Sequence, residues 1–246
     1  MAGFGVSCRA MRIPLTPYGL PQVALYPAII VAAMAVWYVL AGRFFQLACG
    51  CPAMAFLTLW LPEVILFVVL VWMLSFFRDP PRVVPTDPTL LLSPADGKIT
   101  AIETMPSCAG FEGAVLRVEI FLSIFNVHIN RTPCAVRIGQ ITYKPGKFVD
   151  ARRPDCSKIN EANEVEMFRL NTPNDRLLVR QVSGAIARRI VCDLKTGQQC
   201  TAGEKFGMIK FGSCTELYVP MRDNLECVVQ VGHNVKAGLT TLARYK

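Results

Sequence analysis

The stretch AVLRVEIFLSIF, residues 114–125, decides the fold, because it is a long run of the apolar and β-branched residues that favour strands. Similar short runs follow one another after residue 89, separated by Gly, Pro, Asn and Asp; examples are KITAIETM, RLLVRQV, RRIVCDL, TELYVPM and LECVVQV. Only SKINEANEVEMFRL, residues 157–170, reads as weakly helical. Closely spaced strands of this kind predict a mainly β domain with a sandwich- or barrel-like sheet.

The chain before this domain carries two long apolar runs. PQVALYPAIIVAAMAVWYVLAGRFF occupies residues 21–45, and CPAMAFLTLWLPEVILFVVLVWMLSFF occupies residues 51–77. Each is long enough to cross a bilayer core of about 30 Å as a helix. The alternative is a hairpin buried in the core of the protein, but nothing downstream looks able to cover so much apolar surface. We therefore predict an N-terminal membrane-associated helical hairpin over residues 1–78.

The basic residues near the ends of these runs predict their orientation. Arg9 and Arg12 precede the first run and Arg78 and Arg82 follow the second, whereas only Arg43 lies near the short connection. The positive-inside rule then places both ends in the cytoplasm. We expect a protein of the cell (inner) membrane whose β-rich domain lies on the cytoplasmic side.

A proline-rich segment separates the hairpin from the β-rich domain. RDPPRVVPTDP, residues 78–88, contains four prolines that stop any helix, so residues 79–88 read as an extended linker. The β-rich domain is then expected over residues 89–246.

Composition and motifs limit the kinds of ligand and partner that this chain is expected to bind. The net charge of +8 suits anionic phospholipid head groups at a membrane surface. Nucleic acid is not expected, because the basic residues are scattered and no aromatic-studded basic strip is present. Ten cysteines form no C-x-x-C pair and only two histidines occur, so no metal site is expected. No G-x-G-x-x-G or Walker loop indicates a nucleotide.

Residues with catalytic potential occur at three places. Asp96 stands in SPADGKI, which on its own reads as a common Asp-Gly turn. His128 lies in a long apolar run, where a histidine is more often structural, although a carboxylate partner can make it a general base. Gly212 precedes two potential nucleophiles, Ser213 and Cys214. A membrane-tethered hydrolase using Asp96, His128 and Ser213 or Cys214 is one interpretation, although the G-x-S-x-G elbow is absent.

Six segments occur in the order typical of one family: FFRDPPR, SPADGKI, FLSIFNVHINR, ARRIVC, GEKFGMIKFGS and LYVP. On these segments the chain resembles the phosphatidylserine decarboxylase family, in its short, membrane-anchored bacterial and archaeal form. The resemblance covers residue 76 to the C-terminus, and the N-terminal hairpin agrees in character. It implies a lyase of phospholipid biosynthesis that is made as a zymogen.

The resemblance implies a self-processing site. Asp96, His128 and Ser213 match the family's Asp-His-Ser triad, in which the Asp orients the imidazole and the His takes the serine proton. Autocatalytic cleavage would fall between Gly212 and Ser213, giving a β chain of residues 1–212 and an α chain of residues 213–246 that stay associated without a covalent bond. Ser213 would become a pyruvoyl group, which is the only cofactor that the resemblance implies. It implies neither a metal nor a nucleotide.

The resemblance also implies the reaction. The pyruvoyl at position 213 would form a Schiff base with the amine of phosphatidylserine, release CO₂ and yield phosphatidylethanolamine. Asn126, Arg188 and Arg189 are candidates for substrate binding, and Arg152 and Arg153 are further basic neighbours; the alternative is a solvated basic face. The family's longer members have a second histidine before the catalytic one, which this chain lacks. His128, Asn126 and water therefore remain alternatives as the proton donor, and a homodimer is left open.

A non-enzymatic binding module is a third interpretation. VGHNVKAGL, residues 231–239, resembles the turn-and-strand pattern of biotinyl and lipoyl domains. The acceptor-lysine motif of those domains is missing, and a binding module leaves Asp96, His128 and the Gly212-Ser213 pair without a purpose. His233, which lies in this turn, is expected to be structural.

Overall fold

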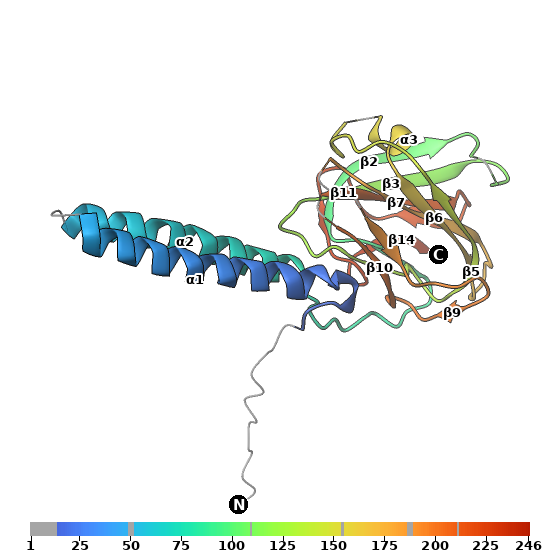
Figure 1. Ribbon diagram of the computed structural model, residues 1–246. Helices are drawn as coiled ribbons and strands as arrows, with labels where there is room; N and C mark the ends of the chain where they lie inside the picture. Colours follow the sequence, from blue (N-terminus) through green and yellow to red (C-terminus); the bar gives the residue numbers. More distant parts are fainter. Residues whose placement is uncertain (1–13, 49–51, 109, 154, 186–188, 211) are drawn as a thin grey trace, which may run out of the picture.

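The computed structural model describes residues 14–48, 52–108, 110–153, 155–185, 189–210 and 212–246 (Figure 1). A long helical hairpin projects from one end of a mainly β body, which confirms the predicted fold class. The hairpin consists of α1 (Gln22–Ala48) and α2 (Pro52–Phe76), preceded by a short 3₁₀ turn, η1 (Pro17–Gly19).

Both hairpin helices are long and apolar enough to span a membrane. Their apolar windows, Gln22–Phe44 and Phe56–Phe76, have mean hydropathies of 2.2 and 2.3, and only 0% and 6% of these windows are buried inside the protein. A core helix of a soluble protein would be mostly buried. The exposed apolar surface therefore suits a lipid environment.

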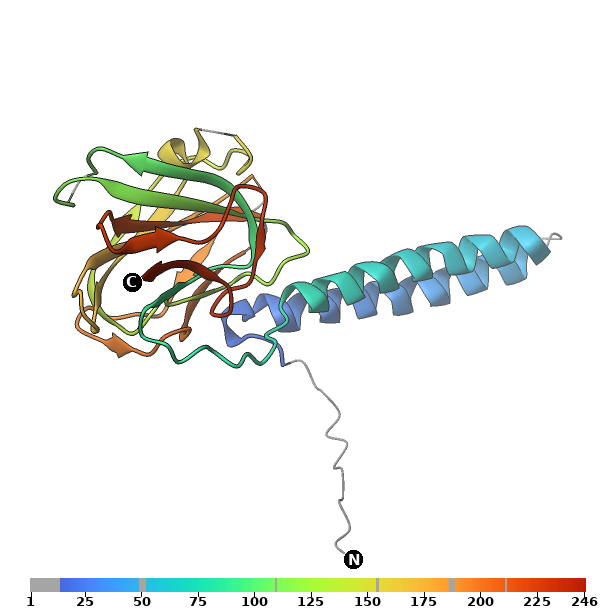
Figure 2. The same cartoon turned by 180° about the vertical axis from the view of Figure 1, so that it is seen from behind.

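The β body is built around one eight-stranded antiparallel sheet that curls around the core (Figures 1 and 2). Its strand order is β13-β2-β3-β11-β7-β6-β5-β9. The strands are β2 (Gly97–Met105), β3 (Val115–Leu122), β5 (Val136–Lys144), β6 (Ala162–Arg169), β7 (Arg176–Val182), β9 (Gln199–Cys200), β11 (Ser213–Pro220) and β13 (Asn234–Val235). β11 therefore lies inside the sheet, paired with β3 over all eight of its residues and with β7 over five.

Two three-stranded sheets complete the body. One has the order β1-β14-β12, with β1 (Leu90–Leu92), β14 (Thr241–Tyr245) and β12 (Leu225–Cys227). The other has the order β4-β10-β8, with β4 (Ile129–Arg131), β10 (Lys205–Ile209) and β8 (Ile190–Cys192). The stretch predicted as weakly helical is mostly a strand: α3 (Cys156–Ile159) is a single turn, and β6 follows it.

Side chains of β11 alternate between two environments, as the pleat of a strand requires. Leu217 and Val219 point into the main core, which contains residues of β2, β3, β5, β6 and β7. Cys214 belongs to a smaller cluster with Cys156, Ala162 and Val182 on the opposite face. Because every second side chain of a strand points to the same face, Ser213 lies on the same core side as Leu217 and Val219.

The root of the hairpin packs directly against the β body (Figure 2). Phe76 and Phe77, at the end of α2, form a buried cluster with Met208 of β10. Lys210 is only 3% exposed, and its Nζ donates a hydrogen bond of 2.8 Å to Gln22 Oε1 at the start of α1. The helices and the segment before Ser213 are thus joined by both apolar and polar contacts.

Candidate active site

Ser213 is the first residue of β11 and stands opposite Leu122 of β3. Its side chain is fully buried, and Oγ makes no hydrogen bond to any residue that the structure describes. A buried hydroxyl without a partner costs about 1–3 kcal/mol. Such a group is unusual in a well-packed sheet, and it marks the position as a candidate for chemistry rather than for stability.

The residue before Ser213 is held in a conformation that suits glycine. Gly212 has φ of +67°, and its N–H points at Nε2 of His128 at 3.4 Å. Its carbonyl oxygen lies against Gly184, where an added Cβ would overlap this oxygen and lie 3.1 Å from the carbonyl carbon. Glycine is therefore needed at both positions, at 212 for the backbone angle and at 184 for the space.

His128 is completely buried beside this peptide. Its Nδ1 donates a 3.0 Å hydrogen bond to the carbonyl oxygen of Asn126, so Nε2 carries the lone pair that faces Gly212. The imidazole ring packs against Phe76 of α2, with the ring centroids 4.3 Å apart and the ring planes tilted by 38°.

The surroundings of His128 keep it neutral. Burial lowers the pKa of His128 to about 4; the hydrogen bond to Asn126 opposes this shift, and the charge of Arg78 adds to it. A neutral imidazole whose Nε2 is unprotonated is the form that can accept a proton; here Nε2 accepts a long hydrogen bond of 3.4 Å from the Gly212 N–H.

Asp96 has other partners than the triad prediction implies. Arg82 binds its carboxylate with two hydrogen bonds of 2.6 and 2.8 Å, and the backbone N–H of Ala237 adds a third of 2.8 Å. Within the described residues no hydrogen bond joins Asp96 to His128. A bidentate guanidinium is a stronger partner for a carboxylate than a neutral imidazole. The catalytic role of Asp96 therefore stays a prediction, and the group that orients His128 here is the Asn126 carbonyl.

Two of the three predicted substrate-binding residues, Asn126 and Arg189, lie in the part of the chain that the structure describes. Asn126 closes a turn: its Oδ1 accepts the Ser123 N–H at 2.9 Å, and its own N–H binds the Ser123 carbonyl at 2.8 Å. Arg189 is exposed just before β8, and its carbonyl accepts the Lys210 N–H. Arg188 lies outside the described residues. Substrate binding by these three residues remains a prediction.

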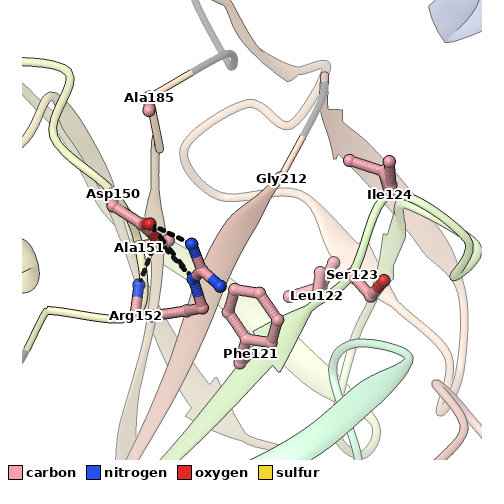
Figure 3. A pocket seen from close by; sticks show the side chains of 9 residues that line it. All are labelled: Phe121, Leu122, Ser123, Ile124, Asp150, Ala151, Arg152, Ala185 and Gly212. Carbon is pink, nitrogen blue, oxygen red and sulfur yellow. Dashed lines mark hydrogen bonds and ion pairs between the residues drawn. The ribbon is translucent and has the colours of Figure 1, made fainter.

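A cavity of about 340 Å³ opens beside Gly212 (Figure 3). Arg152 and Asp150 form one wall, joined by an ion pair, and Ser123 and Ile124 form another. The remaining lining comes from Phe121, Leu122, Ala151 and Ala185. An apolar pocket with a few charged groups at its wall is typical of small-molecule sites.

The side chain of Cys214 points away from that of Ser213, although the two residues are neighbours in the chain. It faces the other side of the sheet, where its Sγ lies 4.0 Å from Sγ of Cys156. This thiol contact and full burial raise the pKa of Cys214, so the thiol stays protonated. The geometry gives no support to a hydrolase that uses Cys214.

A buried polar chain holds the two segments that carry His128 and Ser213. Asn130 Nδ2 donates to Thr215 Oγ1 at 3.1 Å, which joins β4 to β11 two residues after His128 and two residues after Ser213. Gln181 Nε2 donates to Asn130 Oδ1 at 2.9 Å. These hydrogen bonds hold the segment of His128 at a fixed distance from the segment of Ser213.

Sequence reasoning missed several residues of this site. Gly184 lies in the segment VSGA, where nothing but the residue type hints at a special role. The group that it makes room for, the Gly212 carbonyl, is 28 positions further along the chain. Phe76 and Arg82 lie in the hairpin and linker segments, which were expected to anchor the chain rather than to contact the site.

Comparisons with known proteins agree on one family. The family model described as phosphatidylserine decarboxylase matches residues 69–243. A protein of Rhodopirellula baltica is 43% identical over 188 residues, which cover 76% of this chain and 78% of the relative. A protein of Carboxydothermus hydrogenoformans is 38% identical over 192 residues, covering 78% and 88%. One of Trichlorobacter lovleyi is 39% identical over 204 residues, covering 83% and 90%. Each relative is named phosphatidylserine decarboxylase proenzyme.

Proposed function

Because this chain belongs to the phosphatidylserine decarboxylase family, we propose that it cleaves itself between Gly212 and Ser213 and then decarboxylates phosphatidylserine to phosphatidylethanolamine. One observation carries the proposal. The unpartnered hydroxyl of Ser213 follows a glycine peptide whose N–H faces the lone pair of a buried, neutral imidazole.

Self-cleavage uses groups of the chain and one water molecule. Nε2 of His128 accepts the Ser213 Oγ proton, and Oγ attacks the carbonyl carbon of Gly212. The peptide C–N bond then breaks as its nitrogen takes up the proton, which leaves an ester between the two residues. Removal of the Ser213 Cα proton expels the Gly212 carboxylate by β-elimination. The dehydroalanine at position 213 takes up one water, releases ammonia and becomes the pyruvoyl group at the start of the α chain.

The environment of the Gly212 carbonyl suits this attack. Its oxygen must move as the carbonyl carbon becomes tetrahedral, and the bare Cα of Gly184 leaves room beside it. Position 213 also fits the mature group, because it is buried, begins a central strand and adjoins the cavity at Gly212. A pyruvoyl group there supplies an electron sink for the electron pair that the departing carboxylate leaves behind.

The chain's own residues would bind and orient the phospholipid head group. Arg152 lies at the cavity wall, and its partner Asp150 is solvent-accessible, so exchanging that partner for a substrate phosphate or carboxylate costs little. Arg188 and Arg189 lead into β8 and remain candidates for the same task. His128, as the neutral base of the site, is the candidate to return a proton to the substrate carbon after CO₂ leaves.

The membrane hairpin fits a lipid substrate. Its helices would hold the cavity close to the bilayer, on the cytoplasmic side that the basic residues at both ends of the hairpin predict. After cleavage the α chain would stay in place because β11 is paired on both sides by strands of the β chain.

The test is the mass of the purified protein together with its activity. We expect two polypeptides, with a carbonyl-reactive tag on the fragment 213–246, and release of CO₂ from phosphatidylserine. Ser213→Ala should leave one intact, inactive chain, whereas Cys214→Ala should be cleaved as the wild type is. An active preparation of uncut wild-type chain would rule the proposal out.

A further inference from the structure

The turn Ser123–Asn126 joins the cavity to the root of the hairpin. Ser123 and Ile124 line the cavity, whereas the Asn126 carbonyl orients His128. The backbone of this turn is fixed by the two hydrogen bonds between Ser123 and Asn126. Phe125, at its tip, is therefore presented outward rather than folded inward.

Phe125 is 68% exposed, more than any other aromatic side chain among the described large hydrophobic residues. Its carbonyl oxygen accepts a 2.7 Å hydrogen bond from Nη2 of Arg78, two residues after the end of α2. In Figures 1 and 2 the segment between β3 and β4 projects from the body on the side where the hairpin leaves.

These contacts indicate the depth at which the turn would lie relative to a bilayer. The apolar window of α2 ends at Phe76, so the boundary between hydrocarbon and head groups falls near Arg78. Arg78 reaches the turn directly, which places the tip at this same boundary. Aromatic side chains are enriched at that depth because they combine apolar area with tolerance of a wet surface.

We propose that the turn Ser123–Asn126 is a lipid-contacting entrance to the active site, in which Phe125 inserts into the bilayer beside the hairpin. This inference rests on the proposed function. With its tip in the bilayer and its inner side on the cavity, the turn lets a phospholipid head group reach position 213 while its acyl chains stay in the membrane.

The experiment compares two forms of the same substrate. The full-length protein, in vesicles of phosphatidylcholine and phosphatidylserine, is assayed for decarboxylation of the vesicle lipid. The detergent-solubilised protein is assayed with monomeric short-chain phosphatidylserine. For Phe125→Ser we expect the ratio of vesicle to monomer kcat/KM to fall by about tenfold, because a buried phenyl ring is lost from the lipid contact. Phe125→Leu should recover most of the ratio.

Tyr143→Ser is the matched control. Tyr143 is an aromatic residue of β5 with a similar exposure of 60%, and it lies outside the turn and the hairpin root. Its substitution should leave the ratio unchanged. An equal loss on both substrates for Phe125→Ser, or no loss on vesicles, would overturn the inference.

Direct contact with lipid is measured with Phe125→Trp. Its fluorescence, after subtraction of the wild-type signal from Trp37, Trp60 and Trp72, should be quenched by brominated phosphatidylcholine. Absence of quenching would also overturn the inference and would point to a protein contact, such as a second copy of this chain. A failure of the proposed function looks different, because the wild type would then decarboxylate neither substrate.

Discussion

At position 184 the missing side chain makes room for the carbonyl oxygen that self-cleavage would attack. Gly184→Ala should slow cleavage by about a hundredfold or more, because the added methyl group displaces the Gly212 carbonyl from the path of Ser213. The backbone at 184 does not require a positive φ, so the variant should still fold. The measurement is the fraction of split chain against time on a denaturing gel, with circular dichroism as the check on folding.

Gly197→Ala is the control for this substitution. Gly197 has φ of +86° and open space around its Cα, so alanine adds backbone strain of about 1 kcal/mol without touching the site. This variant should lose some stability and still be cleaved at the wild-type rate. Wild-type cleavage by Gly184→Ala would mean that the carbonyl does not occupy this position when it is attacked.

At the scale of elements, the end of α2 packs against His128, the proposed catalytic base. Since burial holds the pKa of His128 at about 4, the imidazole should remain neutral from pH 8 to pH 5, and cleavage should slow only as the pH falls toward 4. Phe76→Ala would admit water to the ring and raise the pKa toward the ordinary value of 6.5. The acid limb of the pH profile, which is the fall in cleavage rate at low pH, should then move to higher pH. Cleavage rates measured in a series of buffers would reveal this shift.

Two further variants separate this effect from a general loss of packing. Phe76→Leu keeps an apolar group over the imidazole and should keep the acid limb near pH 4. Phe77→Ala removes a buried ring that packs edge-on against Phe76, with centroids 5.1 Å apart, and should lower stability without moving the limb. An unchanged limb in Phe76→Ala would show that α2 does not tune His128.

The elements themselves were largely predictable from local patterns. The run at residues 114–125 contains β3 and the second apolar run contains α2, whereas α1 begins inside the first run and continues three residues past its end. These elements are predictable because length and hydrophobicity are local properties. The stretch 157–170 was misread because its charged residues suit a helix in isolation. β6 instead forms between β5 and β7, so partners from elsewhere in the chain decide its state.

The site was only partly predictable for a related reason. Motif order pointed to His128 and Ser213, and the structure brings both to the Gly212 peptide. The partner of Asp96 could not be read from the sequence, because Arg82 and Ala237 come close to it only through the fold. Long-range contacts of this kind leave no periodic signal along the chain.

At the scale of the whole molecule, the proposed cut falls within a continuous hydrogen-bonded body. The α chain would contribute β11 between β3 and β7, and β14 beside β1. Asp175 of the β chain adds a buried polar contact: its carboxylate accepts Arg222 Nη2 at 2.6 Å and the Tyr245 hydroxyl at 2.8 Å. These contacts should hold the two chains together after the peptide bond is lost.

Asp175→Ala tests this association. It removes the acceptor of the buried Tyr245 hydroxyl and the partner of Arg222, which should cost about 1–3 kcal/mol and lower the urea concentration at which the α chain separates. Size-exclusion chromatography of the cleaved protein in increasing urea measures that separation. Glu226→Ala, which breaks a partly exposed pair with Arg244 inside the α chain, should change the midpoint little. Equal midpoints for Asp175→Ala and the wild type would mean that the strand ladders around β11 and β14 alone hold the chains together.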